Sequence, residues 1–538
     1  MHKKNRVLLI VILLAAFLRF YQLGVNPPSL DWDEASLGYN AYSLLKTGRD
    51  EFGRSWPVSI RSFEDYKPAM YTYLTIVPVA IFGLNEFAVR LPSAVFGTLT
   101  IFVVYFLIYE LQRKEMLPSW NSLPFVVALL LSISPWHLQF SRVAFESNVS
   151  LFFVLSGVMF FLKALDTSFW FVASGFFFVL SFYTYHSPRL VVPLLIIGWS
   201  LYFWKKLFLL WKPILISMVI AGIILIPFIH ELATSGRARL SSVTVLTPQG
   251  TLDESIQQID FDKSRNDWLG PLIHNRRIIY TLLLAKGYLD HFNLDFLFLT
   301  GDAPDRHHAR DMGVLYAWEA PFVFLGMIYV FKRKGAFLLF WWFLVAPAAS
   351  AITTGTPHPV RAYLYLPLYQ IFTGVGILQL SKYVRHMSEL RFGIIAISSF
   401  LVFINIFYYF QMYYVHTPIE ASNEWQYGYK QAVEIARRYE NEVNKIVITY
   451  AYDQPHVFVL FYNQVDPTWY QAQWRGEEIK RDNRTFGKYE FRKIDWEKDQ
   501  YLTNTLFIGT PGEIPQGTPL VAEVPFLNGN IAFRITKR

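Results

Sequence analysis

Long apolar blocks dominate this chain and limit what it can fold into. Eleven of them approach the ~20 residues that a helix needs to cross a lipid bilayer. They are Val7–Leu23, Ala88–Leu111, Leu123–Pro135, Val149–Leu165, Phe169–Thr184, Leu190–Trp204, Ile214–Ile229, Gly313–Phe331, Ala336–Ala351, Ala362–Leu380 and Phe392–Met412. Because backbone groups in lipid must be paired within their own segment, these blocks predict membrane-spanning helices. The 53% hydrophobic content and the absence of cysteine exclude a disordered chain and a disulfide scaffold.

Lysine and arginine are distributed unevenly between the short segments that join the blocks. With a cytoplasmic N-terminus, the inner segments carry fifteen and the outer short loops three. The inner residues are Lys3, Lys4, Arg6, Arg113, Lys114, Lys163, Lys205, Lys206, Lys212, Lys332, Arg333, Lys334, Lys382, Arg385 and Arg391. The outer residues are Arg142, Arg189 and Arg361. Because cationic loops resist translocation, this bias predicts eleven crossings from a cytoplasmic N-terminus. It also explains the net charge of +8 without nucleic acid as a partner.

All long hydrophilic segments then face the outside. Residues 1–412 predict a membrane module, with short helices on the outer membrane surface at about residues 31–84 and a large outer loop at 231–312. Residues 413–538 predict a soluble exoplasmic α/β domain. Its expected elements are a helix near Tyr429–Tyr439, an apolar stretch at Val457–Tyr462, and strands at Lys445–Tyr450, Leu506–Ile508, Leu520–Val524 and Ile531–Ile535. The chain is thus predicted to be a polytopic α-helical protein of a plasma membrane, and its compact, cysteine-free sequence suits a prokaryote.

Three carboxylates follow the first apolar block within four residues: Asp31, Asp33 and Glu34. One interpretation is structural, because Asp31 (or Ser29) can cap a helix that ends at Gly48, with acidic side chains favouring its first turn. The other is functional, because a carboxylate at a partly desolvated boundary can act as a general base. The residue types alone leave both interpretations open.

Six sequence features occur in order on the predicted outer face. They are Asp33-Glu34, Tyr66-Lys67-Pro68, FGLNEFAVRLPSAVFG, SPWHLQFSRVAFESN, GDAPDRHH and GTPHPVRAYLYLPLY. Through these features, residues 1 to about 412 resemble the polyprenyl-phosphate-sugar-dependent glycosyltransferases of the GT-C superfamily. They resemble in particular the group of dolichyl-phosphate-mannose protein mannosyltransferases and aminoarabinose transferases.

The resemblance implies an enzyme that moves a sugar from a polyprenyl-phosphate donor to an acceptor hydroxyl at the outer face, with inversion. The acceptor would be a protein, a lipid or a glycan, and membrane lipids would surround the enzyme. The family's acidic pair makes Asp33 the general base and Glu34 a supporting carboxylate. Since negative charge develops on the departing lipid phosphate, cationic donors are needed. The candidates are Lys67, Arg142, Arg189, His358 and Arg361.

The outer cations also have a structural interpretation. A single arginine at a helix end commonly extends to the lipid headgroups. Arg142 can also pair with Glu146, four residues later on one helix face, and this pairing is the preferred interpretation of Glu146. Several such cations on one face nevertheless favour a shared anion site.

The stretch GDAPDRHHARDMG gathers several chemically active side chains. A divalent cation bound by Asp302 and its neighbours would help to neutralise phosphate, whereas a solvated, turn-rich loop would need no ligand. The resemblance points to Arg306 and His307 as donors to phosphate or sugar. Asp31 and Asp65 are further candidates for contact with substrate or a cation. The aminoarabinose transferases place an acid directly before Lys-Pro, where this chain has Tyr66, so a metal site is not carried over.

Two other classes of protein fit the helix count. A transporter or lipid flippase would place polar residues near the middle of the membrane, often in two repeated halves. A structural protein would keep the same helices with an inactive site. Here the polar residues gather at one face and the sequence shows no internal repeat, which favours the enzyme.

Overall fold

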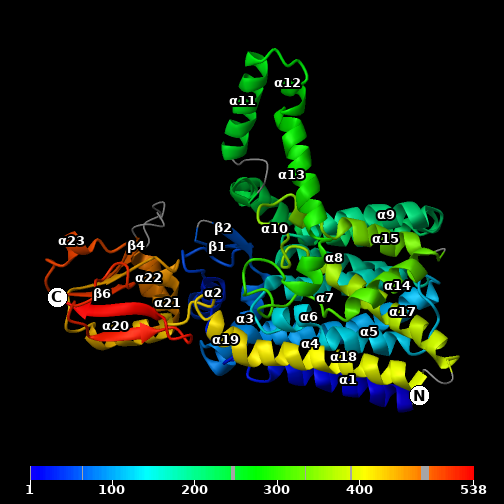
Figure 1. Ribbon diagram of the computed structural model, residues 1–538, viewed down its shortest axis with the longest axis horizontal. Helices are drawn as coiled ribbons and strands as arrows, with labels where there is room; N and C mark the ends of the chain where they lie inside the picture. Colours follow the sequence, from blue (N-terminus) through cyan, green and yellow to red (C-terminus); the bar gives the residue numbers. More distant parts are fainter. Residues whose placement is uncertain (1, 64, 244–248, 334, 388–390, 474–483) are drawn as a thin grey trace.

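The computed structural model describes residues 2–63, 65–243, 249–333, 335–387, 391–473 and 484–538. A long bundle of helices forms its largest part (Figure 1). An α/β domain sits at one end of the bundle, and the N-terminus lies at the opposite end. A separate arm of helices projects crosswise from the bundle, near the end that carries the α/β domain.

Helices occur at all eleven apolar blocks. They are α1 (His2–Phe20), α4 (Glu86–Arg113), α5 (Leu123–Ile133), α7 (Glu146–Ala164), α8 (Trp170–Thr184), α9 (Pro188–Leu209), α10 (Trp211–Val243), α14 (Glu319–Phe331), α15 (Ala336–Val345), α17 (Leu366–Arg385) and α18 (Arg391–Gln411). Short turns extend some of them, namely α6 (Pro135–Ser141), α16 (Ala348–Ala351) and the 3₁₀ turn η2 (Tyr363–Tyr365). The helical class and its apolar character are therefore confirmed.

Length and composition single out fewer helices as spans. Within the described residues, five are long and apolar enough to cross a membrane: α4, α7, α9, the Trp211–Glu231 part of α10, and the run Arg391–Glu420 that contains α18. A sixth arises if α5 and α6, which bend by 59° at their junction, count as one span. Helices α8, α14 and the run Ala336–Ala351 are apolar but shorter, and α1 and α17, although long enough, are not among the five, so the eleven crossings stay a prediction.

Glycines allow helices α14 and α17 to touch backbone to backbone. A Cβ on Gly326 would lie 1.8 Å from the carbonyl oxygen of Phe372, and one on Gly376 would lie 2.1 Å from that of Phe322. No side chain fits at such distances. The two glycines therefore hold this pair of helices closer than any other residue type would permit.

The predicted helix after the first block is present as α2 (Trp32–Thr47). Asp31 caps it, because Oδ1 of Asp31 accepts a hydrogen bond of 2.8 Å from the backbone N–H of Glu34. Gly48 ends it in the left-handed conformation, with φ of 68°. An antiparallel hairpin of β1 (Ser59–Ser62) and β2 (Asp65–Pro68) follows, and then α3 (Met70–Phe82).

The long loop between α10 and α14 is mostly helical. It contains α11 (Gln249–Ser264), α12 (Gly270–Ile273), α13 (Arg276–Asp290) and the π-helical turn η1 (Asp295–Leu299). We call the segment from α11 to α13 the arm. Figure 1 shows it standing away from the bundle.

The C-terminal region folds as an α/β domain around one mixed sheet. Its helices are α19 (Thr417–Glu420), α20 (Tyr429–Tyr439), α21 (Pro455–Tyr462), α22 (Pro467–Gln473) and α23 (Trp496–Asp499), preceded by the π-helical turn η3 (Met412–His416). Its strands are β3 (Lys445–Ile448), β4 (Arg484–Phe486), β5 (Tyr489–Phe491), β6 (Thr505–Gly509), β7 (Ala522–Pro525) and β8 (Ile531–Lys537), in the spatial order β4-β5-β3-β6-β8-β7. The predicted helix and strands are present, strands β4 and β5 were not foreseen, and the apolar stretch Val457–Tyr462 is helix α21.

Helix α2 lies between the bundle and the α/β domain. A Cβ on Gly38 would lie 2.6 Å from the ring of Phe461 on α21 and equally close to Val89 on α4. The hydroxyl of Tyr39 donates to the carbonyl oxygen of Val465 at 3.1 Å. One apolar core therefore runs from α4 through α2 into the sheet.

A buried ion pair fixes α2 to α4. Arg90 donates from Nε to Oε1 of Glu34 at 2.9 Å and from Nη2 to Oε2 at 2.8 Å, and both side chains are fully buried. Arg90 also donates to the carbonyl oxygens of Pro27 and Ser29, at 2.8 and 2.5 Å. The backbone N–H of Ala144 donates to Oε1 of Glu34 at 2.9 Å. The pair thus joins the loop after α1, the start of α2, α4 and the loop before α7.

Removing the acid of this pair should destabilise the protein strongly. In Glu34→Gln the guanidinium of Arg90 stays buried without a counter-charge, which typically costs about 3 to 5 kcal/mol. Thermal unfolding of the purified full chain in detergent measures the loss. Asp253→Asn is the matched control, because Asp253 is an exposed acid on α11. Equal melting temperatures for the two variants would contradict a structural role for the pair.

The orientation across the membrane is directly measurable, because the chain has no native cysteine. We expect Lys498→Cys in the α/β domain to react with a membrane-impermeant maleimide on intact cells. Lys205→Cys, at the cytoplasmic end of α9 in the predicted topology, should react only after permeabilisation. The reverse pattern would invert the topology predicted from the charge distribution.

Candidate active site

The three carboxylates at the start of α2, Asp31, Asp33 and Glu34, lie in three different environments. Residues along a helix turn by about 100° each, so Asp33 and Glu34 cannot share a direction. Glu34 points inward to Arg90, whereas Asp31 forms the cap and faces the loop before α14. Asp33 is the one that reaches solvent, with 44% of its side chain exposed.

Asp33 forms an ion pair with Lys67. Oδ1 of Asp33 accepts a hydrogen bond from Nζ of Lys67, which lies on β2 and is only 14% exposed. Burial opposes the positive charge of Lys67, but the Asp33 carboxylate and the charge of Glu146 outweigh it and raise the pKa of Lys67. A charged ammonium group therefore lies beside an accessible carboxylate at the rim of the bundle.

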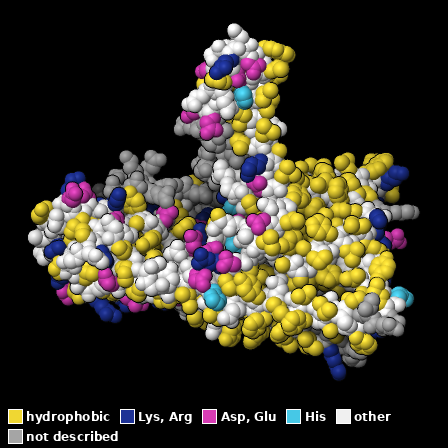
Figure 2. Space-filling view, in the orientation of Figure 1, with side chains coloured by type: hydrophobic (Ala, Val, Ile, Leu, Met, Phe, Trp, Pro, Cys, Tyr) yellow, Lys and Arg dark blue, Asp and Glu magenta, His cyan; other side chains and the backbone are white. Residues whose placement is uncertain are grey.

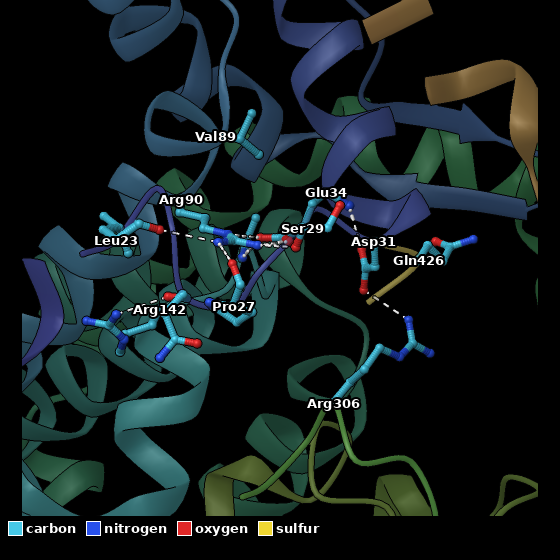
Figure 3. Close-up of polar contacts among 12 residues, drawn as sticks. Leu23, Pro27, Ser29, Asp31, Glu34, Val89, Arg90, Arg142, Arg306 and Gln426 are labelled. Carbon is cyan, nitrogen blue, oxygen red and sulfur yellow. Dashed lines mark hydrogen bonds and ion pairs between the residues drawn. The ribbon is translucent and has the colours of Figure 1, made fainter. Parts of the chain in front are cut away.

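Asp31 forms a second ion pair, with Arg306. Nη1 of Arg306 donates to Oδ2 of Asp31 at 3.0 Å, and its guanidinium lies 4.5 Å from the ring centroid of Trp32. Burial raises the pKa of Asp31 to about 6 against the opposing pull of Arg306. Figure 3 shows Arg306 reaching from its loop toward Asp31, while Glu34 faces the other way.

The α/β domain reaches this site through Gln426. Oε1 of Gln426 accepts from the backbone N–H of Trp32 at 2.8 Å, and its Nε2 donates to the carbonyl oxygens of Tyr452 and Asp453. The first residue of α2 is therefore tied to the C-terminal domain.

Three side chains from two loops lie next to Arg306: those of His307, His358 and Arg361. Nδ1 of His307 lies 2.6 Å from Oδ2 of Asp302, and the rings of His307 and His358 are 5.1 Å apart. Burial lowers the pKa of both histidines, and the charges of Arg306 and Arg361 lower each further. Burial raises the pKa of Asp302 to about 7.

The fixed positive charge of this region therefore comes from the arginines. Arg361 itself donates from Nη1 to Oγ1 of Thr353 and to the carbonyl oxygen of Thr354, at 2.7 and 2.8 Å. Arg306 and Arg361 both act electrostatically on His307 and His358. The fold thus brings together cations and histidines that are far apart in sequence. Lys67 and Arg306 contact the start of α2, and next to Arg306 lie His307, His358 and Arg361.

Arg142 occupies a different environment from this group. It is fully buried and donates to the hydroxyl of Tyr413 at 2.9 Å and to the carbonyl oxygens of Leu18 and Asn26 at 2.8 and 3.0 Å. These contacts tie the end of α1 to the end of α18. The charge of Glu146, predicted to pair with Arg142, acts on Lys67.

Arg189 lies among α8, α9 and α10. It donates to the carbonyl oxygen of Phe182 at 3.1 Å, contacts His186 and lies over the ring of Phe228. Asp65 begins strand β2, but its side chain is outside those that the structure describes. The assignments of Arg142, Arg189 and Asp65 to substrate stay predictions.

The two interpretations of the stretch GDAPDRHHARDMG, a divalent cation site and a loop without a ligand, both stay open. Among the described residues, no three His, Asp or Glu side chains converge as metal ligands would. Asp302 faces His307 and His308, and both ring nitrogens of His308 face backbone carbonyl oxygens, those of Ala309 and Asp302. In this arrangement the nitrogens of His308 are engaged within the loop.

Two residues that organise the site were missed in the sequence. Arg90 carried a readable signal, because a lone arginine within an apolar helix generally has a buried partner or a functional role. Gln426 carried none, since a glutamine in a polar segment is unremarkable. Its importance appears only when the α/β domain is placed beside α2.

Comparison with known proteins places these features in a family context. Residues 66–230 match the family Dolichyl-phosphate-mannose-protein mannosyltransferase. That segment contains Lys67, Arg90 and Arg142. No curated protein matches the chain at a significant level of sequence similarity.

Solved structures of similar fold cover almost the whole chain. ArnT from Cupriavidus metallidurans in the apo state aligns with 99% of this chain and 98% of its own, with a TM-score of 0.55 and 14% identity. The same protein bound to undecaprenyl phosphate aligns with 98% of this chain and 97% of its own, with a TM-score of 0.55 and 13% identity. The chain therefore has the fold of ArnT, with helices long and apolar enough to cross a membrane, and its residues 66–230 carry the sequence pattern of the dolichyl-phosphate-mannose-protein mannosyltransferase family.

Proposed function

We propose that this protein transfers a sugar from a polyprenyl-phosphate donor to an acceptor hydroxyl at the outer face of the membrane, with inversion at the anomeric carbon. The observation that carries the proposal is the placement of Asp33. It is the accessible carboxylate of its trio, it is paired with Lys67, and it lies in the first turn of a helix that adjoins the arginine and histidine group. The match to a mannosyltransferase family and the undecaprenyl phosphate bound by ArnT support the donor class.

In this proposal Asp33 is the general base. Its carboxylate takes the proton of the acceptor hydroxyl while the hydroxyl oxygen attacks the anomeric carbon. The bond between that carbon and the phosphate oxygen breaks, and the phosphate leaves with the electron pair. Asp33 suits this task because its exposed part can meet an acceptor, whereas Asp31 and Glu34 are buried in their own pairs.

The cations beside α2 would hold the donor phosphate. Charge-assisted donors are strong ligands for phosphate oxygens, and they stabilise the charge that develops as phosphate leaves. Lys67, Arg306 and Arg361 are the charged candidates that border the site, while His307 and His358 would act as neutral hydrogen-bond donors. The C-terminal domain, tied to Trp32 through Gln426, would border the path of the acceptor.

Replacing the base should stop turnover and leave donor binding intact. We expect Asp33→Asn to lower the transfer rate by about 10²- to 10⁴-fold, the usual contribution of a general base. The assay uses native membranes as the acceptor source and polyprenyl phosphates that carry labelled hexose or pentose. Asp253→Asn, an exposed acid on α11, is the matched control and should keep full activity.

Two outcomes would contradict the proposal. Unchanged turnover in Asp33→Asn would remove this residue as the base. Movement of labelled lipid across the membrane without any transfer of sugar would instead identify a flippase. Binding of a photoreactive polyprenyl phosphate, measured in parallel, separates a loss of chemistry from a loss of donor affinity.

A further inference from the structure

The arm is an ordered helical hairpin that is anchored to the bundle at its base. The hydroxyl of Tyr288 donates to the carbonyl oxygen of Leu344 at 2.8 Å, and Nε2 of His291 lies 2.7 Å from Oγ of Ser350. A Cβ on Gly287 would lie 2.9 Å from the carbonyl oxygen of Ala351, so this face of α13 sits directly on α16.

The two sides of the hairpin are also held together near its tip. Nδ1 of His274 lies 2.5 Å from Oδ2 of Asp262, and Oγ of Ser255 donates to the carbonyl oxygen of His274 at 2.6 Å. The contacts at the base therefore fix the arm to the bundle, and those near the tip hold its two sides together as one hairpin.

Helix α13 presents an uncovered apolar stripe. Ile278, Leu282, Ala285 and Leu289 are all exposed, and their spacing of four, three and four residues places them on one side of the helix. Gly287, on the other side, faces the bundle. The stripe is therefore turned away from the contact that anchors the arm.

The tip of the arm is apolar as well. Trp268 is 81% exposed, and Leu269, Leu272 and Ile273 near it are also exposed. Exposing such a cluster to water is unfavourable by about 25 cal/mol per Å² of apolar surface. Exposed apolar clusters on a folded protein generally mark a contact surface, and tryptophan is enriched where proteins meet the membrane boundary.

The direction of the arm identifies what covers this surface. The arm runs crosswise to α4, α5 and α18, and it leaves the bundle near the end where the α/β domain sits (Figure 1). If the bundle helices cross a bilayer, the arm therefore runs parallel to the bilayer surface. Figure 2 shows apolar side chains gathered on the α13 side of the arm, next to the apolar surface of the bundle, and acidic side chains on the opposite side.

The charges of the arm favour apolar insertion over electrostatic attraction. Its acidic residues are Asp253, Glu254, Asp260, Asp262, Asp267 and Asp290, and its basic residues are Lys263, Arg265, Arg276, Arg277 and Lys286. The two signs nearly balance, so the arm is not a polybasic segment that requires anionic lipid.

We propose that the arm is a lipid-binding element that lies in the outer membrane surface, with the stripe of α13 and the Trp268 tip inserted between phospholipid headgroups. The outer position rests on the predicted topology, whereas the contact with lipid does not depend on which side the arm occupies. The ligand is the phospholipid bilayer itself, bound along the flank of the bundle beside the candidate active site. The arm thereby widens the footprint of the protein in one leaflet.

Site-directed fluorescence tests this contact in the full-length protein. Leu282→Cys and Leu269→Cys, each labelled with an environment-sensitive fluorophore, are compared with Arg276→Cys, which lies on the opposite side of α13 from the stripe. The protein is held as one copy per nanodisc of phosphatidylcholine. We expect blue-shifted emission and several-fold stronger quenching by doxyl-labelled lipid at 282 and 269 than at 276, with iodide quenching in the reverse order.

The same measurement, repeated with two copies per disc and with anionic lipid, distinguishes the alternatives. Strong iodide quenching at 282 and 269, equal to that at 276, would overturn the proposal. Protection that appears only when two copies share a disc would assign the stripe to a contact between copies and would also overturn it. Lipid quenching that requires anionic lipid would overturn insertion driven by apolar contact. None of these outcomes depends on sugar transfer, so the proposed function is tested separately.

Discussion

The ion pair between Glu34 and Arg90 determines which way the first turn of α2 faces. Its two parallel hydrogen bonds are buried, and the remaining donors of Arg90 hold the carbonyl oxygens of the preceding turn. A guanidinium group removed from water needs such complete pairing. Once Glu34 is fixed inward, helical geometry places Asp33 outward and leaves Asp31 to cap the helix.

The three carboxylates of this segment therefore combine the structural and the chemical interpretations that the sequence had left open. Asp31 is a capping residue and also the partner of Arg306, and Glu34 is a buried counter-ion. Asp33 has no comparable structural task within α2, and its side chain meets solvent beside Lys67. The site is thus built by assigning neighbouring carboxylates to different environments.

Local features were predictable from sequence, whereas partners across the fold were not. The cap at Asp31 and the stop at Gly48 depend on a few adjacent residues, and both are present. The stretch Val457–Tyr462 did not reveal a short helix, because a brief apolar run fits a strand or a helix equally well. A lone Arg142 indicated a reason for its charge but not a direction, which comes from carbonyl oxygens in the loop after α1 and from Tyr413.

The close packing at Gly38 makes the C-terminal domain a part of the membrane module and not a detachable appendage. Phe461 of the C-terminal domain and Val89 of α4 both pack against α2 at Gly38, so the two parts of the chain share one hydrophobic interior. Substitutions in the C-terminal domain that move Phe461 are therefore expected to shift helix α2, which carries Asp33. Residues of the C-terminal domain and of the helical bundle that meet at α2 are thus under a common steric constraint, and a change in one part needs a matching change in the other.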